Sequence, residues 1–311
     1  MKAIRIHAYG GTEVLRLEDA PLPVLGADEL LIRVIGSSVN PVDWKIREGH
    51  LQAMLPYPMP FIPGWDVSGV VHDTGTLVSH FRIGDAVYAR PDISRNGCHA
   101  EFVAVRESEV ALKPRTISHI EAGVLPLAGI TAWEAVVTIG QVQPGQRVLV
   151  HAAAGGVGSL AVQIAKLHGA HVIGTASSRH RALVESLGVN EFVDHEAQPL
   201  RDAVRDVDLV IDTMGGAVQA ASWHAMAPEG MLVSTVSDPA DSLALWPRLR
   251  GATLFIQPNR AVLERLAHFV EAGQLRPVVG AEFALAELAQ AHALSQTGHA
   301  TGKIAIYVGA P

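Results

Sequence analysis

The sequence predicts an α/β protein with two domains, one built on a parallel sheet with crossover helices and the other rich in β-strands. Three observations support this prediction. Short apolar runs alternate with helical stretches from Ile120 to about Pro258, whereas residues 1 to about 115 hold only short strand-like runs. A strand, a glycine turn and a helix can also be read directly from Arg147–Gly169. The chain has 311 residues, which is long enough for both domains.

The N-terminal third is expected to form a β-rich barrel or sandwich. Gly and Pro separate its strand-like runs at spacings typical of such folds, and regular alternation with helices is absent there. The expected strands are Lys2–His7, Glu29–Ser37, Asp66–His72, Asp85–Ala89 and Glu101–Val105.

The segment Arg147–Gly169 predicts a pocket for the two phosphates of a dinucleotide. Arg147–His151 is a short apolar run suited to a buried strand, and apolar residues follow at helical spacing from Val157 to His168. Between them stand the glycines Gly155, Gly156 and Gly158. Glycine gives a tight turn, lets backbone N–H groups approach a pyrophosphate and allows close helix–strand packing. The alternative is a glycine-rich turn without a ligand, because the A-x-x-G-x-x-G spacing only resembles the strict G-x-G-x-x-G form.

Further strands favour the dinucleotide interpretation. A second strand, His171–Ala176, starts where a βαβ unit requires one. Val207–Asp212 and Met231–Val236 follow, with helical stretches between them. Together these segments predict a Rossmann dinucleotide-binding domain.

The residues after the second strand distinguish the two nicotinamide cofactors. An acidic side chain there would bind the free ribose 2′-hydroxyl of NAD. This chain has Ser177, Arg179 and Arg181 instead, and hydroxyl and guanidinium groups suit a 2′-phosphate. We therefore expect NADPH as the cofactor. The alternative is that both arginines are ordinary solvated charges in the first turn of a helix.

Composition and charge exclude several function classes. The formal net charge is −7 and the basic residues are scattered, which indicates neither a nucleic-acid groove nor an anionic membrane surface. No apolar run reaches the length of a membrane span, and Met1–Arg5 opens into a strand pattern instead of a signal peptide. A cytoplasmic protein is therefore expected. Cys98 is the only cysteine, which excludes an internal disulfide and a multi-cysteine metal site.

The C-terminal part is expected to contain the helices Arg260–Ala272 and Ala286–Gln296, with Arg276–Phe283 between them and a final strand at Lys303–Val308. Ala252–Gln257 is expected to be the last strand of the parallel sheet, and such an exposed apolar edge tends to be paired or covered. A two-fold homodimer that joins two sheets would satisfy it. The alternative is an edge covered by the C-terminal helices.

Several segments resemble one protein family. They are Gly36–Gly49 (GSSVNPVDWKIREG), Ile62–Val71 (IPGWDVSGVV), Gly84–Ala89 (GDAVYA), Gly97–Val105 (GCHAEFVAV), Ala128–Val136 (AGITAWEAV), the glycine turn and Gly302–Val308 (GKIAIYV). In this order they are similar to the zinc-free quinone oxidoreductase branch of the medium-chain dehydrogenase/reductases. The resemblance implies a GroES-like catalytic domain of residues 1–117 and 274–311, with a Rossmann NADP-binding domain of residues 118–273 inserted into it. It also implies a homodimer.

The residues at the family's zinc positions predict a site without metal. Zinc-dependent relatives carry a Cys ligand in the segment matching Val39–Asp43 and a His ligand in the segment matching Gly64–Asp66. This chain has Asn40 and Trp65 at those places, and neither an amide nor an indole is a normal zinc ligand. The 15 histidines are scattered along the chain, so no metal is expected.

Four residues are candidates for the catalytic site. Asn40 is expected to donate to the substrate carbonyl, Asp43 to hold the loop, and Lys45 to reach a phosphate or the developing oxyanion. The alternatives are a turn at Asn40, a helix cap at Asp43 and a solvated Lys45. Related enzymes often have a tyrosine where Trp44 or Lys45 stands, so their phenolic proton donor is not carried over. Tyr57 is the nearest substitute, and the alternative is that its proline-rich loop only lines the pocket while solvent provides the proton.

The resemblance implies further cofactor contacts. Thr131 matches a residue near the nicotinamide-side phosphate, and Phe255–Gln257 matches a backbone segment that meets the carboxamide. His195 stands where relatives commonly have a tyrosine near the 2′-phosphate, and a surface role is its alternative. The full set of expected cofactor contacts is Thr131, Gly155, Gly156, Val157, Gly158, Ser177, Arg179, His195, Ser234, Thr235, Val236, Phe255, Ile256 and Gln257.

These observations predict an NADPH-dependent oxidoreductase that transfers hydride to quinones or α,β-unsaturated carbonyl compounds without zinc. In such substrates conjugation places the developing negative charge on an oxygen that hydrogen-bond donors can stabilise, whereas saturated alcohols would need a metal or a strong base. Two alternatives stay open. One is a reductase confined to enals or enones, and the other is a non-catalytic protein that binds NADPH as a sensor or structural element.

Overall fold

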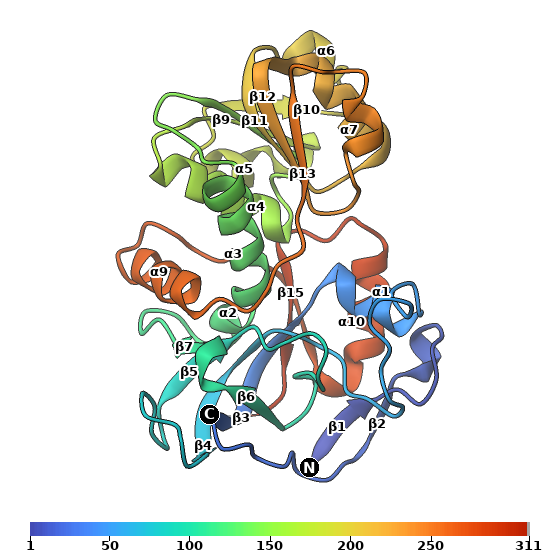
Figure 1. Ribbon diagram of the computed structural model, residues 1–311, viewed down its shortest axis with the longest axis vertical. Helices are drawn as coiled ribbons and strands as arrows, with labels where there is room; N and C mark the ends of the chain where they lie inside the picture. The colour runs from blue at the N-terminus through green and yellow to red at the C-terminus, as the bar shows by residue number, and fades with distance from the viewer. Residues whose placement is uncertain (310–311) are drawn as a thin grey trace. The chain divides into compact units, whose positions relative to one another are not determined.

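The computed structural model describes residues 1–309, whose contacts divide the chain into two compact units (Figure 1). Unit 1 contains Met1–Leu127, Gln257–Gly273 and the chain from Pro277 onward, and unit 2 contains Ala128–Ile256 and Gln274–Arg276. By contacts, residues 118–127 and 257–273 group with unit 1, whereas the sequence analysis counted them with the nucleotide-binding domain.

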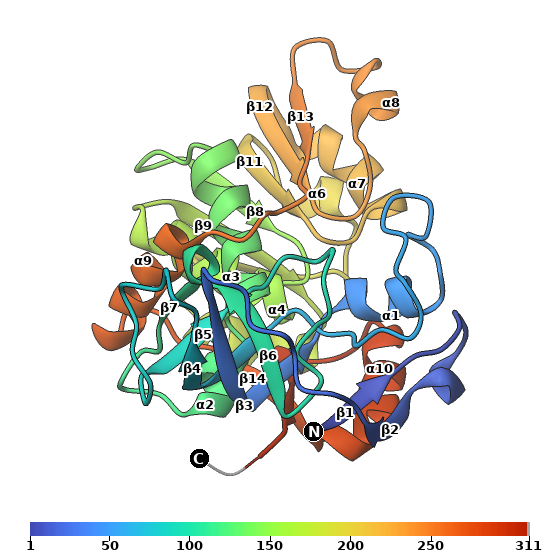
Figure 2. The same cartoon turned by 60° about the horizontal axis from the view of Figure 1, so that its bottom comes forward.

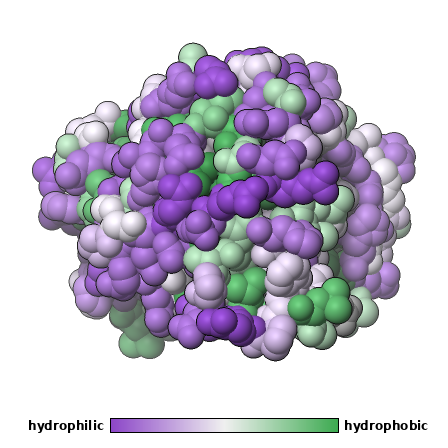
Figure 3. Space-filling view, turned by 90° about the horizontal axis from the view of Figure 1, so that it is seen from above, coloured by the Kyte–Doolittle hydropathy of each residue, from purple (hydrophilic) through white to green (hydrophobic). Residues whose placement is uncertain are grey.

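The surface is mainly hydrophilic on the face shown in Figure 3, where hydrophobic residues lie in small groups between polar ones. The exposed large hydrophobic residues of the chain include Val24, Leu77 and Leu245, which are far apart in the sequence. None of the helices formed by residues 1–309 combines the length and apolar character that crossing a membrane needs.

Unit 1 is built on strands and short helices from both ends of the chain. Its strands are β1 (Lys2–Arg5), β2 (Arg16–Asp19), β3 (Glu29–Val39), β4 (Val67–Thr74), β5 (Ala86–Ala89), β6 (Phe102–Arg106), β7 (Val110–Leu112), β14 (Val279–Ala284) and β15 (Lys303–Tyr307). Its helices are α1 (Pro41–Arg47), α2 (His119–Gly123), α9 (Arg260–Glu271) and α10 (Leu288–Gln296), with single 3-10 turns η1 (Thr12–Val14), η2 (Glu107–Glu109) and η6 (Leu285–Glu287).

The main sheet of unit 1 has the order β14-β15-β3-β4-β5-β7, and β6 also pairs with β3 (Figure 2). All of its pairs are antiparallel except β14 with β15. Leu30, Ile32 and Val34 alternate along β3 and pack into a core with apolar residues of β4, β5 and β6. This core fixes β3, so the residues at its carboxyl end are held in place by the sheet.

Unit 2 is a doubly wound α/β domain. Its strands are β8 (Arg147–Val150), β9 (His171–Ala176), β10 (Glu191–Asp194), β11 (Val207–Asp212), β12 (Met226–Ser234) and β13 (Arg250–Thr253). Its helices are α4 (Gly156–Leu167), α5 (Arg181–Ser186), α6 (Leu200–Ala203), α7 (Gly216–Ser222) and α8 (Ala240–Leu243), with the short turns η4 (Ser178–His180) and η5 (Trp223–Ala225). Before β8, α3 (Pro126–Trp133) continues into a π-helical segment, η3 (Glu134–Ile139).

The sheet of unit 2 has the order β10-β9-β8-β11-β12-β13, and every pair is parallel. Numbered within the domain, this is the order 3-2-1-4-5-6 of the Rossmann fold. The expected α/β class, with a Rossmann domain and a second, β-rich domain, is therefore confirmed. In such sheets ligands bind at the carboxyl ends of the strands.

Several expected elements differ from the structure. The last strand of the unit 2 sheet is Arg250–Thr253 and not Ala252–Gln257, because its partner β12 ends at Ser234, which pairs with Thr253. Phe255 is 51% exposed just beyond it. β2 and β7 were not expected, and both are short strands whose formation depends on distant partners, β1 and β5.

Candidate active site and nucleotide-binding edge

The first candidate site lies where β3 ends and α1 begins in unit 1. Asn40 follows β3 in an extended conformation, and Pro41 starts the helix at a position where its missing N–H costs nothing. The Asn40 N–H donates to Asp43 Oδ2 over 2.7 Å, and the Asp43 N–H donates to the Asn40 carbonyl over 2.9 Å. Asp43 therefore caps the helix that carries Lys45.

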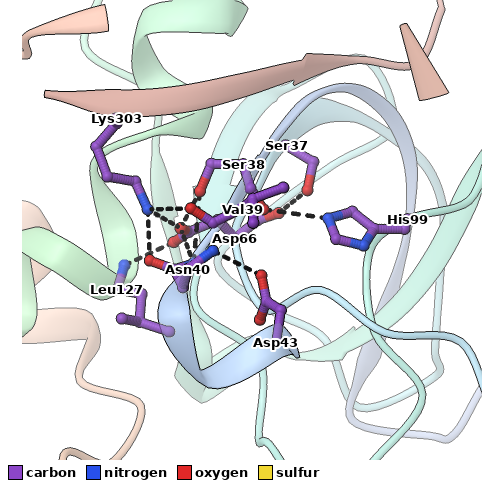
Figure 4. Close-up of polar contacts among 9 residues, drawn as sticks. All are labelled: Ser37, Ser38, Val39, Asn40, Asp43, Asp66, His99, Leu127 and Lys303. Atoms are coloured by element: carbon purple, nitrogen blue, oxygen red, sulfur yellow. Dashed lines mark hydrogen bonds and ion pairs between the residues drawn. The ribbon is translucent and has the colours of Figure 1, made fainter. Parts of the chain in front are cut away.

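A buried carboxylate organises the side chains around this turn (Figure 4). Asp66 is fully buried, and its Oδ2 accepts hydrogen bonds from Ser38 Oγ at 2.5 Å and from Asn40 Nδ2 at 2.8 Å. Lys303 Nζ lies 3.4 Å from the same oxygen, and Oδ1 accepts the backbone N–H of Leu127 at 2.6 Å. We call Ser38, Asn40, Asp66 and Lys303 the Asp66 cluster.

Lys303 supplies the positive charge of the Asp66 cluster. Its side chain is 7% exposed, and its ammonium also donates to the Val39 carbonyl at 3.3 Å and to Asn40 Oδ1. Because Oδ1 of Asn40 faces Lys303 and Nδ2 faces Asp66, both ends of the amide are engaged inside the cluster. Asn40, which was expected to donate to a substrate carbonyl, is 2% exposed and has its side chain turned inward.

Asp43 is a buried carboxyl group with an unusual protonation state. Burial raises its pKa from 3.8 to about 8, although the Asn40 N–H and the charge of Lys303 oppose the shift. Its Oδ1 has no hydrogen-bond partner among the described residues. A group with this pKa is mostly protonated at neutral pH, so Asp43 caps α1 without placing a second full negative charge near Asp66.

α1 also presents a cation toward solvent. Lys45 is partly exposed, and its ammonium lies 5.7 Å from the centre of the Trp44 ring. His50 packs edge-on against the same ring, with the ring centres 6.0 Å apart. The face of an aromatic ring attracts a cation. Lys45 is therefore held beside Trp44, where it can meet an anionic oxygen.

Tyr57 lies in an apolar cluster of unit 1. Its ring stacks on that of Phe61, with the ring centres 4.3 Å apart, and its hydroxyl donates to the carbonyl of Ile93. Burial raises the pKa of the hydroxyl well above its usual value. The phenolic proton is thus engaged by the backbone, and Tyr57 offers a substrate no unbound proton.

The side chains of this site do not fit a zinc ion. Asn40 offers an amide, and Trp65 is fully buried in the same apolar cluster as Tyr57. Across residues 1–309, no group of three or more His, Cys, Asp or Glu side chains is arranged to hold a metal. The ammonium of Lys303 already contacts Asn40 and Asp66, and it would repel a second cation there.

Unit 2 carries the second candidate site, at the turn between β8 and α4. Ala152 adopts a left-handed conformation with φ 47°, and Gly155 precedes α4 in an extended conformation. A Cβ at Gly158 would lie 2.1 Å from the Ala152 carbonyl oxygen, so only glycine fits here without moving the backbone. The first amides of α4, those of Gly156 and Val157 among them, have no acceptor within the helix. These features fit the pyrophosphate of a dinucleotide.

Asp212 organises the carboxyl ends of β11 and β12. It is fully buried, and its Oδ1 accepts the N–H groups of Met214 at 2.9 Å and Gly215 at 2.8 Å. Its Oδ2 accepts Ser234 Oγ at 2.9 Å, and its carbonyl accepts the Thr235 N–H at 2.9 Å. Ser234 and Thr235, both expected cofactor contacts, are therefore held at the sheet edge by one carboxylate residue.

The carboxyl ends of β9 and β10 lie side by side, because Asp194 pairs with Ala176. Ser177 follows β9 and is buried, and the His195 N–H lies 3.4 Å from the Ala176 carbonyl. Arg179 is exposed in the short turn after Ser177. The fold thus brings together three of the residues expected to contact a 2′-phosphate.

The other expected cofactor contacts are more dispersed. Thr131 is buried in α3, whereas Val236 and Phe255 are exposed beyond the ends of β12 and β13. Ile256 is buried at the end of unit 2, and Gln257 groups with unit 1.

Three organising residues of these sites were not identified from the sequence: Asp66, Lys303 and Asp212. Each is a charged residue beside an apolar strand run: Asp66 and Lys303 stand at the start of their runs and Asp212 stands at the end of VDLVID. Such a residue at a strand end signals a buried polar contact, but the sequence does not show which partner it meets.

The chain matches two family profiles. Residues 26–116 match the family described as alcohol dehydrogenase GroES-like domain, and residues 187–306 match the family described as zinc-binding dehydrogenase.

Similar proteins span nearly the whole chain. It is 36% identical over 320 residues to the chloroplastic NADPH-dependent alkenal/one oxidoreductase of Arabidopsis thaliana, covering 99% of this chain and 79% of that protein. It is 31% identical over 322 residues to a chloroplastic quinone-oxidoreductase homolog of Spinacia oleracea, covering 98% of each. The solved structure of the quinone oxidoreductase from Coxiella burnetii aligns with a TM-score of 0.92 at 35% identity, covering 99% of both chains.

Proposed function

Because the chain belongs to the quinone oxidoreductase branch of the medium-chain dehydrogenase/reductase superfamily, we propose that it is an NADPH-dependent reductase of quinones or α,β-unsaturated carbonyl compounds. The observation that carries the proposal is the glycine turn at the carboxyl edge of a sheet with Rossmann strand order. Two of the relatives that span the chain are named as an alkenal/one oxidoreductase and as a quinone-oxidoreductase homolog.

The end of β9 supports NADPH over NADH. When bound, the reduced nicotinamide supplies the hydride. Arg179 offers a guanidinium that neutralises a 2′-phosphate, and Ser177 and His195 offer hydrogen-bond donors beside it. The relative from Arabidopsis thaliana is named as NADPH-dependent.

The chain's own residues orient the reaction and stabilise its charge. The amides at the start of α4 bind the pyrophosphate. Lys45, held against Trp44, stabilises the negative charge that develops on the substrate oxygen. Asp43 caps α1 and so fixes the helix that carries Lys45. The proton that completes the reduction comes from solvent, because the Tyr57 hydroxyl is bound to the backbone.

The test follows NADPH and NADH oxidation against a panel of quinones, enals, enones and saturated aldehydes, with and without chelator. We expect turnover of quinones or enones with NADPH, little turnover of saturated aldehydes, and no effect of the chelator. Exclusive use of NADH would contradict the role given to Arg179. Activity that is lost to chelator and restored by zinc would contradict the mechanism.

The same panel separates two narrower functions. Turnover of enals and enones without turnover of quinones would restrict the protein to the alkenal/one class named for one relative. Tight NADPH binding in calorimetry without turnover of any acceptor would favour a sensor or structural role. Absence of binding to both nucleotides would overturn the proposed function altogether.

We also propose that two copies of the chain form a dimer through β13. This strand is the edge of the unit 2 sheet, and β12 is its pairing partner. Leu245 and Phe255, on either side of β13 in the sequence, are 80% and 51% exposed. Pairing two such edges across a two-fold axis would satisfy their backbone groups. Light scattering that gives the mass of a single chain at every concentration would contradict this.

A further inference from the structure

The Asn40 amide has one favourable orientation, and Lys303 helps to set it. Asn40 Oδ1 accepts from the Lys303 ammonium, and Nδ2 donates to Asp66 Oδ2 at 2.8 Å and faces Ser38 Oγ at 3.5 Å (Figure 4). A flipped amide would place its N–H groups against the ammonium and its oxygen against the carboxylate. Both new contacts would be repulsive, so the two charges together exclude the flipped state.

Stability alone is a weak reason for this ion pair. Lys303 and Asp66 are 7% and 0% exposed, so both charges are removed from water. The desolvation of such a pair offsets most of its attraction, and apolar replacements are often neutral or stabilising. The effect of the pair on the geometry of Asn40 is the better reason for its presence.

The orientation of Asn40 is transmitted to α1. Asn40 is the residue before the helix, and its N–H donates to Asp43 Oδ2 at 2.7 Å. Its side chain is tied to β15 through Lys303 and to the residue before β4 through Asp66. The first turn of α1 is therefore anchored to two strands of the unit 1 sheet, and Lys45 lies in the following turn of the same short helix.

We propose that Lys303 is a positioning residue for the reduction: by holding the Asn40 amide in one orientation, it fixes the start of α1 and with it Lys45. This inference rests on the proposed function. Lys303 itself contacts Val39, Asn40 and Asp66, and its role is exerted through Asn40.

The test compares variants of the full-length protein. Lys303→Met removes the donor but leaves Asp66 without its counter-charge, so the double variant Lys303→Met/Asp66→Asn is made beside it. Lys113→Met is the matched control. Lys113 in the same unit also donates to backbone carbonyls, those of Pro114 and Ile117, and lies outside the Asp66 cluster.

For the double variant we expect a melting temperature close to that of Lys113→Met, an unchanged KM for NADPH and a kcat about tenfold below that of the wild type. Amide hydrogen exchange should accelerate in α1 and stay unchanged in β3, which the sheet holds. A folded double variant with wild-type kcat would overturn the proposal. Lys303 would then serve only to neutralise the buried charge of Asp66.

If the double variant does not fold, Lys303→Arg tests the positioning role of Lys303 instead. It keeps the positive charge near Asp66, but its planar guanidinium cannot reproduce the donor geometry of an ammonium at Asn40 Oδ1. A lowered kcat with an unchanged melting temperature supports the proposal, and full kcat overturns it.

Wild-type turnover separates this inference from the proposed function. If the wild type binds NADPH but reduces neither quinones nor enones, the proposed function fails. Hydrogen exchange in α1 then still reports on Lys303, and exchange in α1 that is the same in Lys303→Arg as in the wild type overturns the positioning role.

Discussion

Among single residues, Asp43 has the clearest pH signature. Burial raises its pKa from 3.8 to about 8, so the folded state keeps a proton that the unfolded chain releases. The stability contributed by this proton is fully present below pH 3.8 and is lost as the pH rises through about 8. Asp43→Asn cannot ionise, yet it keeps an oxygen for the Asn40 N–H.

We therefore expect Asp43→Asn to gain stability relative to the wild type as the pH rises. The expected slope is at most about 1.4 kcal/mol per pH unit between the two pKa values. Urea unfolding of both proteins at several pH values from 4 to 8 measures the difference. A difference that is constant over this range would contradict the assigned protonation of Asp43.

Arg179 and Arg181 allow a matched test of how the protein distinguishes NADPH from NADH. Arg181 is already engaged, because its guanidinium lies 3.3 Å from Glu185 and over the Phe192 ring at 4.2 Å. Arg179 is exposed after β9, so its charge is available to a 2′-phosphate. We expect Arg179→Ala to raise the KM for NADPH by about tenfold and to leave the KM for NADH unchanged.

Arg181→Ala is the control for this prediction. It should change the KM values for the two nucleotides by similar small factors, because its contacts are structural. Steady-state kinetics with both nucleotides measure the ratio of the KM for NADPH to the KM for NADH in each variant. Equal effects of Arg179→Ala on NADPH and NADH would remove Arg179 from the 2′-phosphate site.

Residue roles could be predicted from the sequence only where a local pattern reports them. Asn40, Asp43 and Lys45 stand in one short segment, and the structure does place them on one short helix and its N-cap. The partners Asp66 and Lys303 lie 26 and 263 residues from Asn40, and no local pattern links them. Asn40 therefore looked available from the sequence, whereas the fold engages both ends of its amide.

At the scale of elements, two glycines of the β8–α4 turn should separate folding from binding. A Cβ at Gly158 would lie 2.1 Å from the Ala152 carbonyl oxygen, and the backbone would have to move. A Cβ at Gly155 would lie 3.2 Å from the same oxygen, and the Gly155 backbone is in a conformation open to alanine.

We expect Gly158→Ala to lower the melting temperature and to weaken NADPH binding together. Gly155→Ala should keep a melting temperature near that of the wild type and still weaken NADPH binding, because its methyl group keeps the backbone from the pyrophosphate. Thermal unfolding and calorimetry measure the two effects. Wild-type NADPH affinity in Gly155→Ala would show that the turn does not approach the phosphates.

Elements could be predicted where their signal is local. The segment from β8 through α4 to β9 has the expected order, because glycine chemistry and helical spacing are both written within about 30 residues. The last sheet strand was predicted to begin two residues and to end four residues too late, since β13 ends where its partner β12 ends. Strand ends depend on pairing, and pairing with a distant strand leaves no mark in the strand's own sequence.

For the whole molecule, buried histidines make both units sensitive to acid. Unit 1 buries His99, whose Nε2 donates to the Ser38 carbonyl, and His292, whose Nδ1 accepts from Arg47. Burial lowers the pKa of His99 from 6.5 to about 4 and that of His292 well below 6.5. In unit 2, burial lowers the pKa of His151 from 6.5 to about 4. Stability from neutral histidines is present above pH 6.5 and is lost as the pH falls through the lowered values.

The balance of opposing groups within unit 1 sets how strongly acid destabilises that unit. Each fully buried histidine removes up to about 1.4 kcal/mol per pH unit below its unfolded pKa, and His99 and His292 act together. His119 adds to them with a pKa lowered to about 4, but water screens it because it is only half-buried. Asp43 acts in the opposite direction as its proton returns below pH 8, and it offsets about one of the buried histidines.

We therefore expect both units to lose amide protection as the pH falls from 7 to 4.5, as measured by hydrogen exchange. His292→Gln should delay this loss, because glutamine keeps an acceptor for Arg47 and cannot take up a proton. His299→Gln, at an exposed position of the same unit, is the control and should behave as the wild type. Amide protection that is unchanged between pH 7 and 4.5, or a His292→Gln variant as acid-sensitive as the wild type, would show that the buried histidines do not set the acid limit of the fold.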